Sequence, residues 1–400
     1  MHSMTRRGTQ ARHAPAVLML VVLVALLAGC SGSSAPPASH SPSTAAATAT
    51  ATATTGLQPA LAYVHLPAGY RATLWASGLN VPRFMTFGPD GALFVAQRGG
   101  SIVALRDPGR SGRATQRIVV ASGLDGPSSV VSTNGVLYVG ENSRISRITL
   151  GTDLRAASVT TLIPALPTGG QHTTRTVLLG PDGRIYVSIG SSCDDCFESD
   201  PHRAAVWVWN ADGSGGRLYA KGLRNAVGMA IDPWNQQIWV TNMGRDYLGD
   251  NTPPDTIYTL VDGGNYGWPT CHAGTIVDPQ RGHAGACNGV QQPLVTMQAH
   301  SAPLALAFSP RGPFPAQYHS LFVAFHGSWN RSVPTGYKIV AIPLDAHGNV
   351  AGAVQDFATG WLRSDGTARG RPAGLAVGSD GALYVSDDAT GNIYRIASTG

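Results

Sequence analysis

The chain has 400 residues, with 28 Lys and Arg against 23 Asp and Glu, a formal net charge of +5 and 43% hydrophobic residues. Three of the basic residues, Arg6, Arg7 and Arg12, lie in residues 1–29, which hold no acid, so the remainder carries 25 basic and 23 acidic residues, a net charge of +2. This small excess gives no reason to expect a nucleic-acid partner. The apolar run near the N-terminus is too short for a membrane-spanning helix.

Residues 1–29 have the pattern of a bacterial lipoprotein signal peptide. A basic start is followed by the apolar run APAVLMLVVLVALLAG and by LAGC, which ends at Cys30. We expect cleavage before Cys30 and lipidation of this cysteine. A cytosolic start with a buried apolar helix is the alternative, and Arg6 with Arg7 also fits a twin-arginine export signal. The prediction is an exported protein held at the outer face of the bacterial cell membrane, with no membrane contact except its lipid.

Residues 30–56 are predicted to be a disordered Ala/Thr/Ser/Pro tether. Residues 31–56 contain no Asp, Glu, Lys or Arg and no large apolar side chain. Such a segment cannot bury enough apolar surface to offset the entropy lost on ordering. The globular part is therefore expected to be residues 57–400.

Repeats indicate the fold of residues 57–400. One pattern recurs, an apolar strand, a turn such as Asp-Gly and a second strand, and it occupies residues 82–105, 127–148, 174–192, 226–246, 303–328 and 372–396. Each copy is typical of a β-hairpin, and helical periodicity is absent. Six copies predict an all-β, six-bladed β-propeller. Residues 70–79 are expected to close the ring as the outer strand of the last blade, and residues 245–300 to be long loops.

Four cysteines remain after Cys30, namely Cys193, Cys196, Cys271 and Cys287. Export favours disulfides. A zinc site is disfavoured because there is no second Cys-x-x-Cys, and a thioredoxin-like centre is disfavoured because the motif follows a strand of the predicted propeller. We expect the pairs Cys193–Cys196 and Cys271–Cys287, although four cysteines allow three pairings.

Polar side chains recur where the loops of the predicted propeller meet. His172 opens the third repeat after two glycines, and comparable stages of other repeats carry Arg224, Asn225, Asn330, Arg331, Arg369 and Arg371. Several arginines facing one channel would suit an anionic ligand with carboxylates or phosphates. The alternative is that His172 is an ordinary hydrogen-bonded residue and that the arginines tie blades together through loop carbonyls.

Longer motifs carry a family resemblance over about residues 66–397. The segments GSSCDDCFESDPHRAAVWVWNADGSGGRLYAKGLRNAVGMAIDP, NMGRDYLGDNTPPD, GGNYGWPTC and HGSWNRSVPTGYKIV resemble the PQQ-dependent sugar dehydrogenases, in particular the L-sorbosone dehydrogenase subgroup. The resemblance implies a six-bladed propeller that holds pyrroloquinoline quinone (PQQ) and Ca²⁺. It also implies oxidation of an aldose or sugar aldehyde at C1, with a small-molecule sugar as partner and an unidentified electron acceptor.

The resemblance also assigns roles to residues. His172 matches the general base that takes the proton of the sugar hydroxyl while hydride passes to the quinone. Arg224 matches the arginine that stabilises the quinone oxygen, and Asn225 matches its cofactor-contacting neighbour.

The predicted metal and carboxylate contacts come from three further motifs. Gly244 and Arg245 match a turn whose carbonyl oxygens ligate calcium, and Asp246 and Asp255 are supporting acids. The resemblance assigns the remaining cofactor contacts to Arg369, Arg371 and either Asn330 or Arg331.

Two departures keep other functions open. Glucose-oxidising relatives carry an acid where this chain has Gln171, and Thr256 replaces a usual second acid. A calcium-dependent lactonase propeller would need carboxylate side chains in the channel. A non-catalytic propeller displayed on a tether to bind a sugar polymer or an envelope protein would not need His172 and the arginines together.

Overall fold

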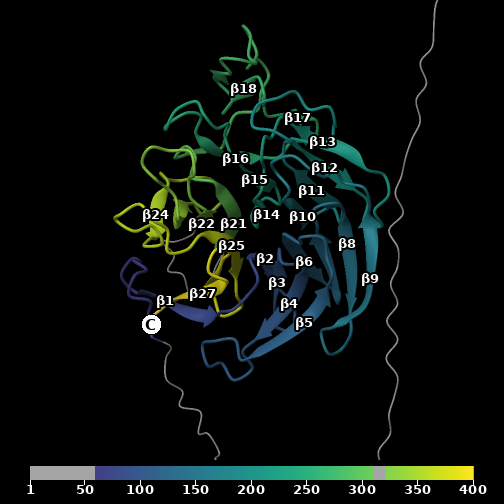
Figure 1. Cartoon of the computed structure of the whole chain (residues 1–400), viewed down its shortest axis with the longest axis vertical. Coiled ribbons are helices and arrows are strands. Elements are labelled where there is room, and N and C mark those ends of the chain that lie inside the picture. The colour runs from purple at the N-terminus through teal and green to yellow at the C-terminus, as the bar shows by residue number, and fades with distance from the viewer. Residues whose placement is uncertain (1–58, 310–319, 400) are drawn as a thin grey trace, which may run out of the picture. The chain divides into compact units, whose positions relative to one another are not determined.

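Strands account for the regular structure of the chain in the computed structural model, which describes residues 59–309 and 320–399. These residues contain strands β1 to β27 and no helix. They belong to one compact unit that spans residues 54–400. Most strands form six sheets arranged around a centre (Figure 1), each with four antiparallel strands, and the sheet of the third blade has β17 (Gly264–Asn265) as a fifth strand, parallel to its outer strand. The predicted six-bladed β-propeller is confirmed.

The blades follow one another along the chain. The first three are β2 (Pro82–Phe87), β3 (Leu93–Gln97), β4 (Ser101–Arg106) and β5 (Gln116–Ser122); β6 (Ser129–Thr133), β7 (Val136–Gly140), β8 (Ile145–Leu150) and β9 (Ala156–Ile163); and β10 (Arg175–Leu179), β11 (Ile185–Ile189), β12 (Ala205–Trp209) and β13 (Arg217–Lys221). The last three are β14 (Met229–Ile231), β15 (Ile238–Asn242), β16 (Asp255–Thr259) and β20 (Val295–Met297); β21 (Pro303–Ser309), β22 (Ser320–Phe325), β23 (Lys338–Pro343) and β24 (Gln355–Ala358); and β25 (Pro372–Val377), β26 (Leu383–Asp387), β27 (Asn392–Ser398) and β1 (Tyr70–Ala76).

The ring is closed by strands from both ends of the described chain. The first strands of the blades contact one another in the order β2, β6, β10, β14, β21 and β25, and β25 returns to β2. In the last blade, β1 pairs antiparallel with β27, with Tyr70 opposite Ser398. The prediction that residues 70–79 supply this outer strand is confirmed.

Strands buried on both faces explain how the blades stack. In β3, Leu93 and Val95 pack toward the last blade, whereas Phe94 and Ala96 pack toward the second. Since successive side chains of a strand point to opposite faces, one apolar strand contributes to the core on each side of its blade. Apolar clusters of this kind lie between all six pairs of neighbouring blades.

Residues 245–300 differ from the expectation of loops alone. Two strands of the fourth blade, β16 and β20, lie in this segment together with β17 (Gly264–Asn265), β18 (Cys271–His272) and β19 (Ile276–Val277). The pattern was missed because β16 directly follows two prolines and β20 has only three residues. As expected, the segment forms no additional blade.

The signal peptide predicted in residues 1–29, the lipidation site Cys30 and the tether of residues 30–56 lie outside the described residues. Across residues 59–309 and 320–399 we find no helix with the length and apolarity to cross a bilayer.

Candidate functional site

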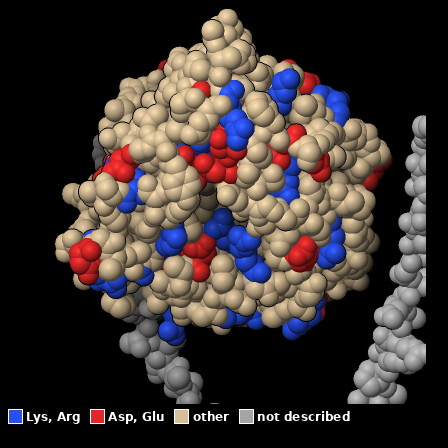
Figure 2. All heavy atoms as spheres, turned by 45° about the horizontal axis from the view of Figure 1, so that its top comes forward, with Lys and Arg blue, Asp and Glu red and all other residues tan. Residues whose placement is uncertain are grey.

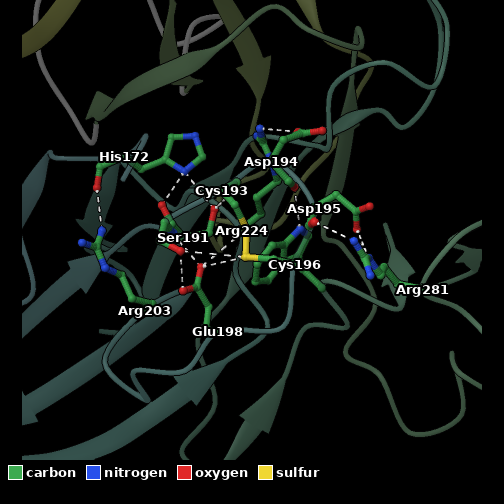
Figure 3. Close-up of a disulfide and its surroundings, with 12 residues drawn as sticks. His172, Ser191, Cys193, Asp194, Asp195, Cys196, Glu198, Arg203, Arg224 and Arg281 are labelled. Atoms are coloured by element: carbon green, nitrogen blue, oxygen red, sulfur yellow. Dashed lines mark hydrogen bonds and ion pairs between the residues drawn. A yellow bond between two sulfur atoms is a disulfide. The ribbon is translucent and has the colours of Figure 1, made fainter. Parts of the chain in front are cut away.

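His172 lies just before β10, with one ring nitrogen fixed by hydrogen bonds. Its Nδ1 is 3.0 Å from the Ser191 carbonyl oxygen and 2.9 Å from Ser191 Oγ (Figure 3). Because Ser191 Oγ donates its own hydrogen to the Cys193 carbonyl oxygen at 2.6 Å, both Ser191 oxygens accept from His172. We therefore assign the hydrogen to Nδ1, which leaves a lone pair on Nε2. This imidazole can accept a proton at Nε2.

The surroundings of His172 favour its neutral form. Burial lowers the pKa of His172 to about 3, and the positive charge of Arg224 acts in the same direction, followed by Arg203 and Arg175. The latter two also fix the main chain, since Arg175 Nη1 donates to the His172 carbonyl oxygen at 3.1 Å and Arg203 Nη2 donates to the Gly169 carbonyl oxygen at 2.6 Å. His172 is therefore an uncharged proton acceptor at neutral pH.

A glycine allows His172 to pack against Asn225. A Cβ on Gly190 would lie 2.6 Å from both His172 Cβ and Asn225 Oδ1, closer than any side chain tolerates. Asn225 is held by its main-chain N–H, which donates to Asn242 Oδ1 at 3.1 Å. The structure thus brings together two residues that the sequence predicted for one site.

Arg224 is buried next to this pair and donates hydrogen bonds from all three of its side-chain nitrogens. Its Nη2 donates to Asp194 Oδ1 at 2.7 Å and to Asp246 Oδ2 at 2.9 Å, and its Nη1 donates to the Gly244 carbonyl oxygen at 2.7 Å. Its Nε donates to the Asp194 main-chain carbonyl oxygen at 3.2 Å. Asp194 was not among the predicted site residues, although its place inside the Cys-x-x-Cys motif was the available signal.

Gly244, Asp246 and Asp255 meet around the predicted calcium turn. Asp255 accepts from the main-chain N–H groups of Gly244 at 2.9 Å and Ala302 at 3.0 Å. Burial raises the pKa of Asp255 to about 6, against these two hydrogen bonds. Burial also raises the pKa of Asp246, with Arg224 opposing. Asp255 therefore fixes the turn, whereas Asp246 contacts Arg224.

The side chain of Arg245 lies among several acids, one of which is Asp194, with its Oδ2 3.7 Å from Arg245 Nε. It is bonded to Asp278 and Gln280, and its Nη2 lies 3.1 Å from Asp195 Oδ2. Asp278 also accepts from His272 at 2.8 Å. Burial alone would raise the pKa of Asp278, but the hydrogen bonds from His272 and Arg245 hold it well below its ordinary value. Because the Arg245 side chain is engaged by these acids, the atom of Arg245 that could ligate calcium in the predicted turn is its main-chain carbonyl oxygen.

The donors around Arg224 fit a hard cation in kind. Gly244 contributes a carbonyl oxygen, and Asp194 and Asp246 contribute carboxylates, the ligand types that Ca²⁺ takes. Within the described ranges, the one group of three His, Cys, Asp or Glu ligand atoms close enough to share a metal is Cys193, Cys196 and Glu198. The two sulfurs of that group form a disulfide and cannot act as thiolate ligands.

A second group of charged residues includes Arg371. Its Nε donates to the His326 carbonyl oxygen at 3.1 Å, and its Nη2 donates to the Gly327 carbonyl oxygen at 2.7 Å. His326 Nε2 lies 2.9 Å from Asp388 Oδ1, and Arg83 Nη1 donates to Asp388 Oδ2 at 2.5 Å. Burial lowers the pKa of His326, with Asp388 opposing, so we treat His326 as neutral.

Arg98 connects this second group to the neighbourhood of His172. Its Nη2 donates to Thr173 Oγ1 at 2.8 Å, and no carboxylate of the described chain lies within ion-pair distance of it. Burial and the positive charge of Arg83 lower the pKa of Arg98. We name Arg83, Arg98, His326, Arg371 and Asp388 the arginine wall. On the face drawn in Figure 2, acidic and basic side chains gather around a central hollow.

The arginine wall holds two more positive than negative charges, because three guanidinium groups face one carboxylate and a neutral imidazole. Sequence reasoning found Arg371 and missed the other four members. The available signal was position, since Arg98 follows β3, His326 follows β22 and Asp388 follows β26, the second strands of three blades.

The remaining predicted residues divide between the site and the loops. Asn330 Nδ2 donates to Asp246 Oδ1 at 2.9 Å, and Asn330 Oδ1 is buried without a hydrogen-bond partner. Arg331 Nη1 bonds to the Asp250 carbonyl oxygen and donates to the Ala299 carbonyl oxygen at 3.3 Å. Arg331 thus ties two loops together, which is the alternative that the sequence left open.

Arg369 also makes a contact of another kind. Its guanidinium lies over the Tyr63 ring, 5.3 Å from the centroid, and its main-chain N–H donates to the Trp361 carbonyl oxygen. The structure does not place its side chain among the contacts of His172, Arg224 or the arginine wall.

Both predicted disulfides are confirmed. Cys193 pairs with Cys196, with a Cα–Cα distance of 6.1 Å, and Cys271 pairs with Cys287 at 5.3 Å.

Comparison with known proteins places the chain in a family. A family described as TrAA12-like matches residues 64–399. The chain belongs to the TrAA12-like family. The predicted resemblance to PQQ-dependent sugar dehydrogenases is confirmed, whereas the L-sorbosone dehydrogenase subgroup stays a prediction.

Individual relatives differ in how much of their length is shared with this chain. An uncharacterized protein of Borreliella burgdorferi is 31% identical over 224 residues, which cover 54% of this chain and 57% of that protein. A pyrroloquinoline quinone-dependent sugar dehydrogenase of Hypocrea jecorina is 24% identical over 444 residues, which cover 96% and 97%. The chain thus spans little more than half of the Borreliella protein and nearly all of the Hypocrea enzyme.

A solved structure agrees with the TrAA12-like fold. The holo form of the pyranose dehydrogenase PQQ domain from Coprinopsis cinerea superposes with a TM-score of 0.73, covering 85% of this chain and 98% of that chain. At 24% sequence identity this likeness shows the fold alone.

Proposed function

We propose that the protein is a PQQ- and calcium-dependent dehydrogenase that oxidises an aldose or sugar aldehyde at C1, with His172 as the general base. The observation that carries the proposal is the orientation of His172, whose Nδ1 is occupied by Ser191 and whose Nε2 keeps its lone pair. An imidazole that is neutral and fixed in this tautomer can remove the proton of a substrate hydroxyl.

The arginine wall supports an anionic cofactor. PQQ carries three carboxylates, and the wall has an excess of two positive charges, to which Arg98 contributes a guanidinium with one neutral partner. Guanidinium groups bind carboxylates through paired hydrogen bonds. The wall would therefore hold the carboxylates, while Arg224 and Asn225 would lie near the redox-active part of the same cofactor.

Chemically, the bound quinone would supply the hydride acceptor and calcium would supply Lewis acidity at its carbonyl oxygen. The chain itself contributes the remaining functions. Arg224 keeps a positive charge close to His172, which disfavours the protonated imidazole until negative charge arrives. Gly244, Asp194 and Asp246 are the oxygen donors proposed for the cation.

Two exposed aromatic rings support a sugar as substrate. Tyr247 and Trp329 are 70% and 65% exposed, with ring centroids 5.5 Å apart and planes at 83°. Each is the chain neighbour of a residue in the hydrogen-bonded pair Asp246 and Asn330. Aromatic faces pack against the C–H faces of pyranose rings while the hydroxyls stay in water.

The geometry favours this proposal over a lactonase. A lactonase of this fold would need carboxylate ligands that face the channel, whereas the two carboxylates proposed for the cation here, Asp194 and Asp246, both accept hydrogen bonds from Arg224.

The proposal also includes export through residues 1–29 and anchoring through a lipid on Cys30.

The test is a titration of the purified protein with PQQ and Ca²⁺, followed by absorbance before and after a panel of aldoses and sugar aldehydes is added. We expect saturable binding and sugar-dependent quinone reduction, with a turnover loss of about 10²- to 10⁴-fold in His172→Ala. His202→Ala is the matched control, because His202 pairs with Asp200 and stacks on Trp207. Failure to bind micromolar quinone would reject the dehydrogenase and leave lactone hydrolysis or sugar-polymer binding to be tested.

A further inference from the structure

The loop between β11 and β12 connects the proposed base to the proposed arginine. Residues 190–204 contain no strand, yet this loop contacts both His172 and Arg224. We propose that the four-residue ring closed by the Cys193–Cys196 disulfide is a positioning device that sets the tautomer of His172 and the orientation of Arg224. The inference rests on the proposed function for the roles of these two groups.

One branch of the device runs from the ring to His172. The Cys193 carbonyl oxygen accepts the hydrogen of Ser191 Oγ at 2.6 Å. Once that hydrogen is committed, Ser191 Oγ can only accept from His172 Nδ1, at 2.9 Å. The Cys193 carbonyl thereby keeps Ser191 Oγ an acceptor, beside the Ser191 carbonyl oxygen at 3.0 Å, so that both oxygens favour hydrogen on Nδ1. Figure 3 shows this chain of contacts beside the disulfide.

A second branch runs from the ring to Arg224. The Asp194 carbonyl oxygen accepts from Arg224 Nε at 3.2 Å and from Trp268 Nε1 at 3.2 Å. The Asp194 carboxylate accepts from Arg224 Nη2 at 2.7 Å and from the Asp246 main-chain N–H at 2.8 Å. Main chain and side chain of one ring residue thus fix the plane of the guanidinium.

The ring holds two adjacent acids that share Arg245 and otherwise pair with different arginines, since Asp194 bonds to Arg224 and lies 3.7 Å from Arg245 Nε. Asp195, next to Asp194, lies 3.1 Å from Arg245 and 3.1 Å from Arg281. Two like charges at neighbouring positions repel, and a loop without strand hydrogen bonds gives them many other arrangements. A covalent link across the four residues removes most of these arrangements.

The base of the loop is closed independently of the disulfide. Glu198 accepts from the Ser192 main-chain N–H at 2.6 Å and from Ser192 Oγ at 2.7 Å. Breaking the disulfide should therefore loosen the ring without releasing the whole loop, so that its effect on His172 can be measured in a folded protein.

The experiment uses the full chain carrying Cys271→Ala and Cys287→Ala, in which Cys193–Cys196 is the remaining disulfide. A water-soluble phosphine reduces it to two thiols and is itself oxidised to the phosphine oxide, with one water molecule supplying the oxygen of the oxide and the two thiol hydrogens. Nitrogen NMR of histidine-labelled, cofactor-free protein reports the tautomer, and His172→Gln identifies the signal. We expect one tautomer with hydrogen on Nδ1 before reduction and a mixture of both tautomers after it, reversed by reoxidation.

An unchanged His172 tautomer in reduced, folded protein would overturn the proposal, with folding checked by circular dichroism. If reduction unfolds the protein, two variants with the disulfide intact decide. Ser191→Ala leaves the main-chain carbonyl as the one Ser191 acceptor for Nδ1, so the second tautomer should become detectable, and Ser191→Thr, which keeps the hydroxyl, should restore the single one. A Ser191→Ala spectrum identical to the native one would refute the branch to His172. Since these measurements use protein without quinone, they remain decisive if the proposed dehydrogenase activity fails.

Discussion

Replacing Arg98 by Met should weaken the binding of PQQ without weakening the fold. Arg98 has Thr173 Oγ1 as its hydrogen-bond partner, and burial together with Arg83 lowers its pKa. A lowered pKa means that the folded protein holds the charged form less favourably than the unfolded chain does. Met keeps an apolar stem of similar length and removes that charge.

The size of the effect follows from the charges of the arginine wall. Three guanidinium groups face one carboxylate, so an incoming carboxylate meets Arg98 without competition from an acid. A hydrogen bond to a charged group contributes about 1.5–3 kcal/mol. Since each 1.4 kcal/mol is a factor of ten, Kd for PQQ should rise roughly 10- to 150-fold.

Kd is measured by absorbance titration with PQQ and Ca²⁺, and the melting temperature of cofactor-free protein is measured by calorimetry. We expect the melting temperature of Arg98→Met to stay level or rise. Arg184→Met is the control, because Arg184 lies on an exposed turn 3.7 Å from Asp182 and should change neither quantity. A Kd within twofold of native, or a clear fall in melting temperature, would refute the reasoning.

Four further changes test separate parts of the site. His172→Gln should lose less stability than the native protein as pH falls from 6.5 towards 3, because in that window the unfolded chain gains a proton that the folded histidine, with a pKa of about 3, refuses. Asp255→Asn should cost about 1–3 kcal/mol by urea unfolding, since an amide oxygen can satisfy only one of its two backbone donors without presenting its own NH₂ group to the other. The variant should also abolish the stability that this acid contributes below pH 4 and loses as pH rises through about 6. Gly190→Ala should displace His172 and lower kcat, with a loss of about 1–3 kcal/mol of stability from overpacking. Trp329→Ala should raise KM for the sugar roughly 2- to 12-fold, from about 0.5–1.5 kcal/mol of ring contact, with little change in kcat.

Contrary results can be stated for the changes at His172, Gly190 and Trp329. Equal acid sensitivity of native protein and His172→Gln would show that His172 is not held neutral by its surroundings. A normal kcat in Gly190→Ala would remove the close packing from the account of the base. A loss of kcat without a change of KM in Trp329→Ala would exclude a role of this ring in binding sugar.

The sequence alone determined the blade count and the outer strand that closes the ring. Both depend on a local repeat, the alternation of apolar residues around a turn, and the residues of one hairpin carry that signal by themselves. The two disulfides followed from the number and spacing of cysteines after Cys30. Because strand prediction depends on this local alternation, β20, which has three residues, and β16, which follows two prolines, were not predicted from the sequence.

Within the candidate site, motif positions predicted His172, Arg224, Asn225 and Arg371, and their roles remain proposals. The tertiary structure alone decided which charges meet. Arg83 and Asp388 are 305 residues apart in the chain and become partners only because the last blade closes on the first. Pairing across blades depends on ring closure, which no single repeat encodes.

The sequence also could not decide which of the neighbours Asn330 and Arg331 belongs to the candidate site. Asn330 reaches Asp246, whereas Arg331 ties two loops together. Adjacent residues of a loop point in different directions, and the sequence gives no periodicity from which to choose between them. The direction is fixed by the partners that the fold presents, and for the base and its arginine these partners are Ser191 and Asp194.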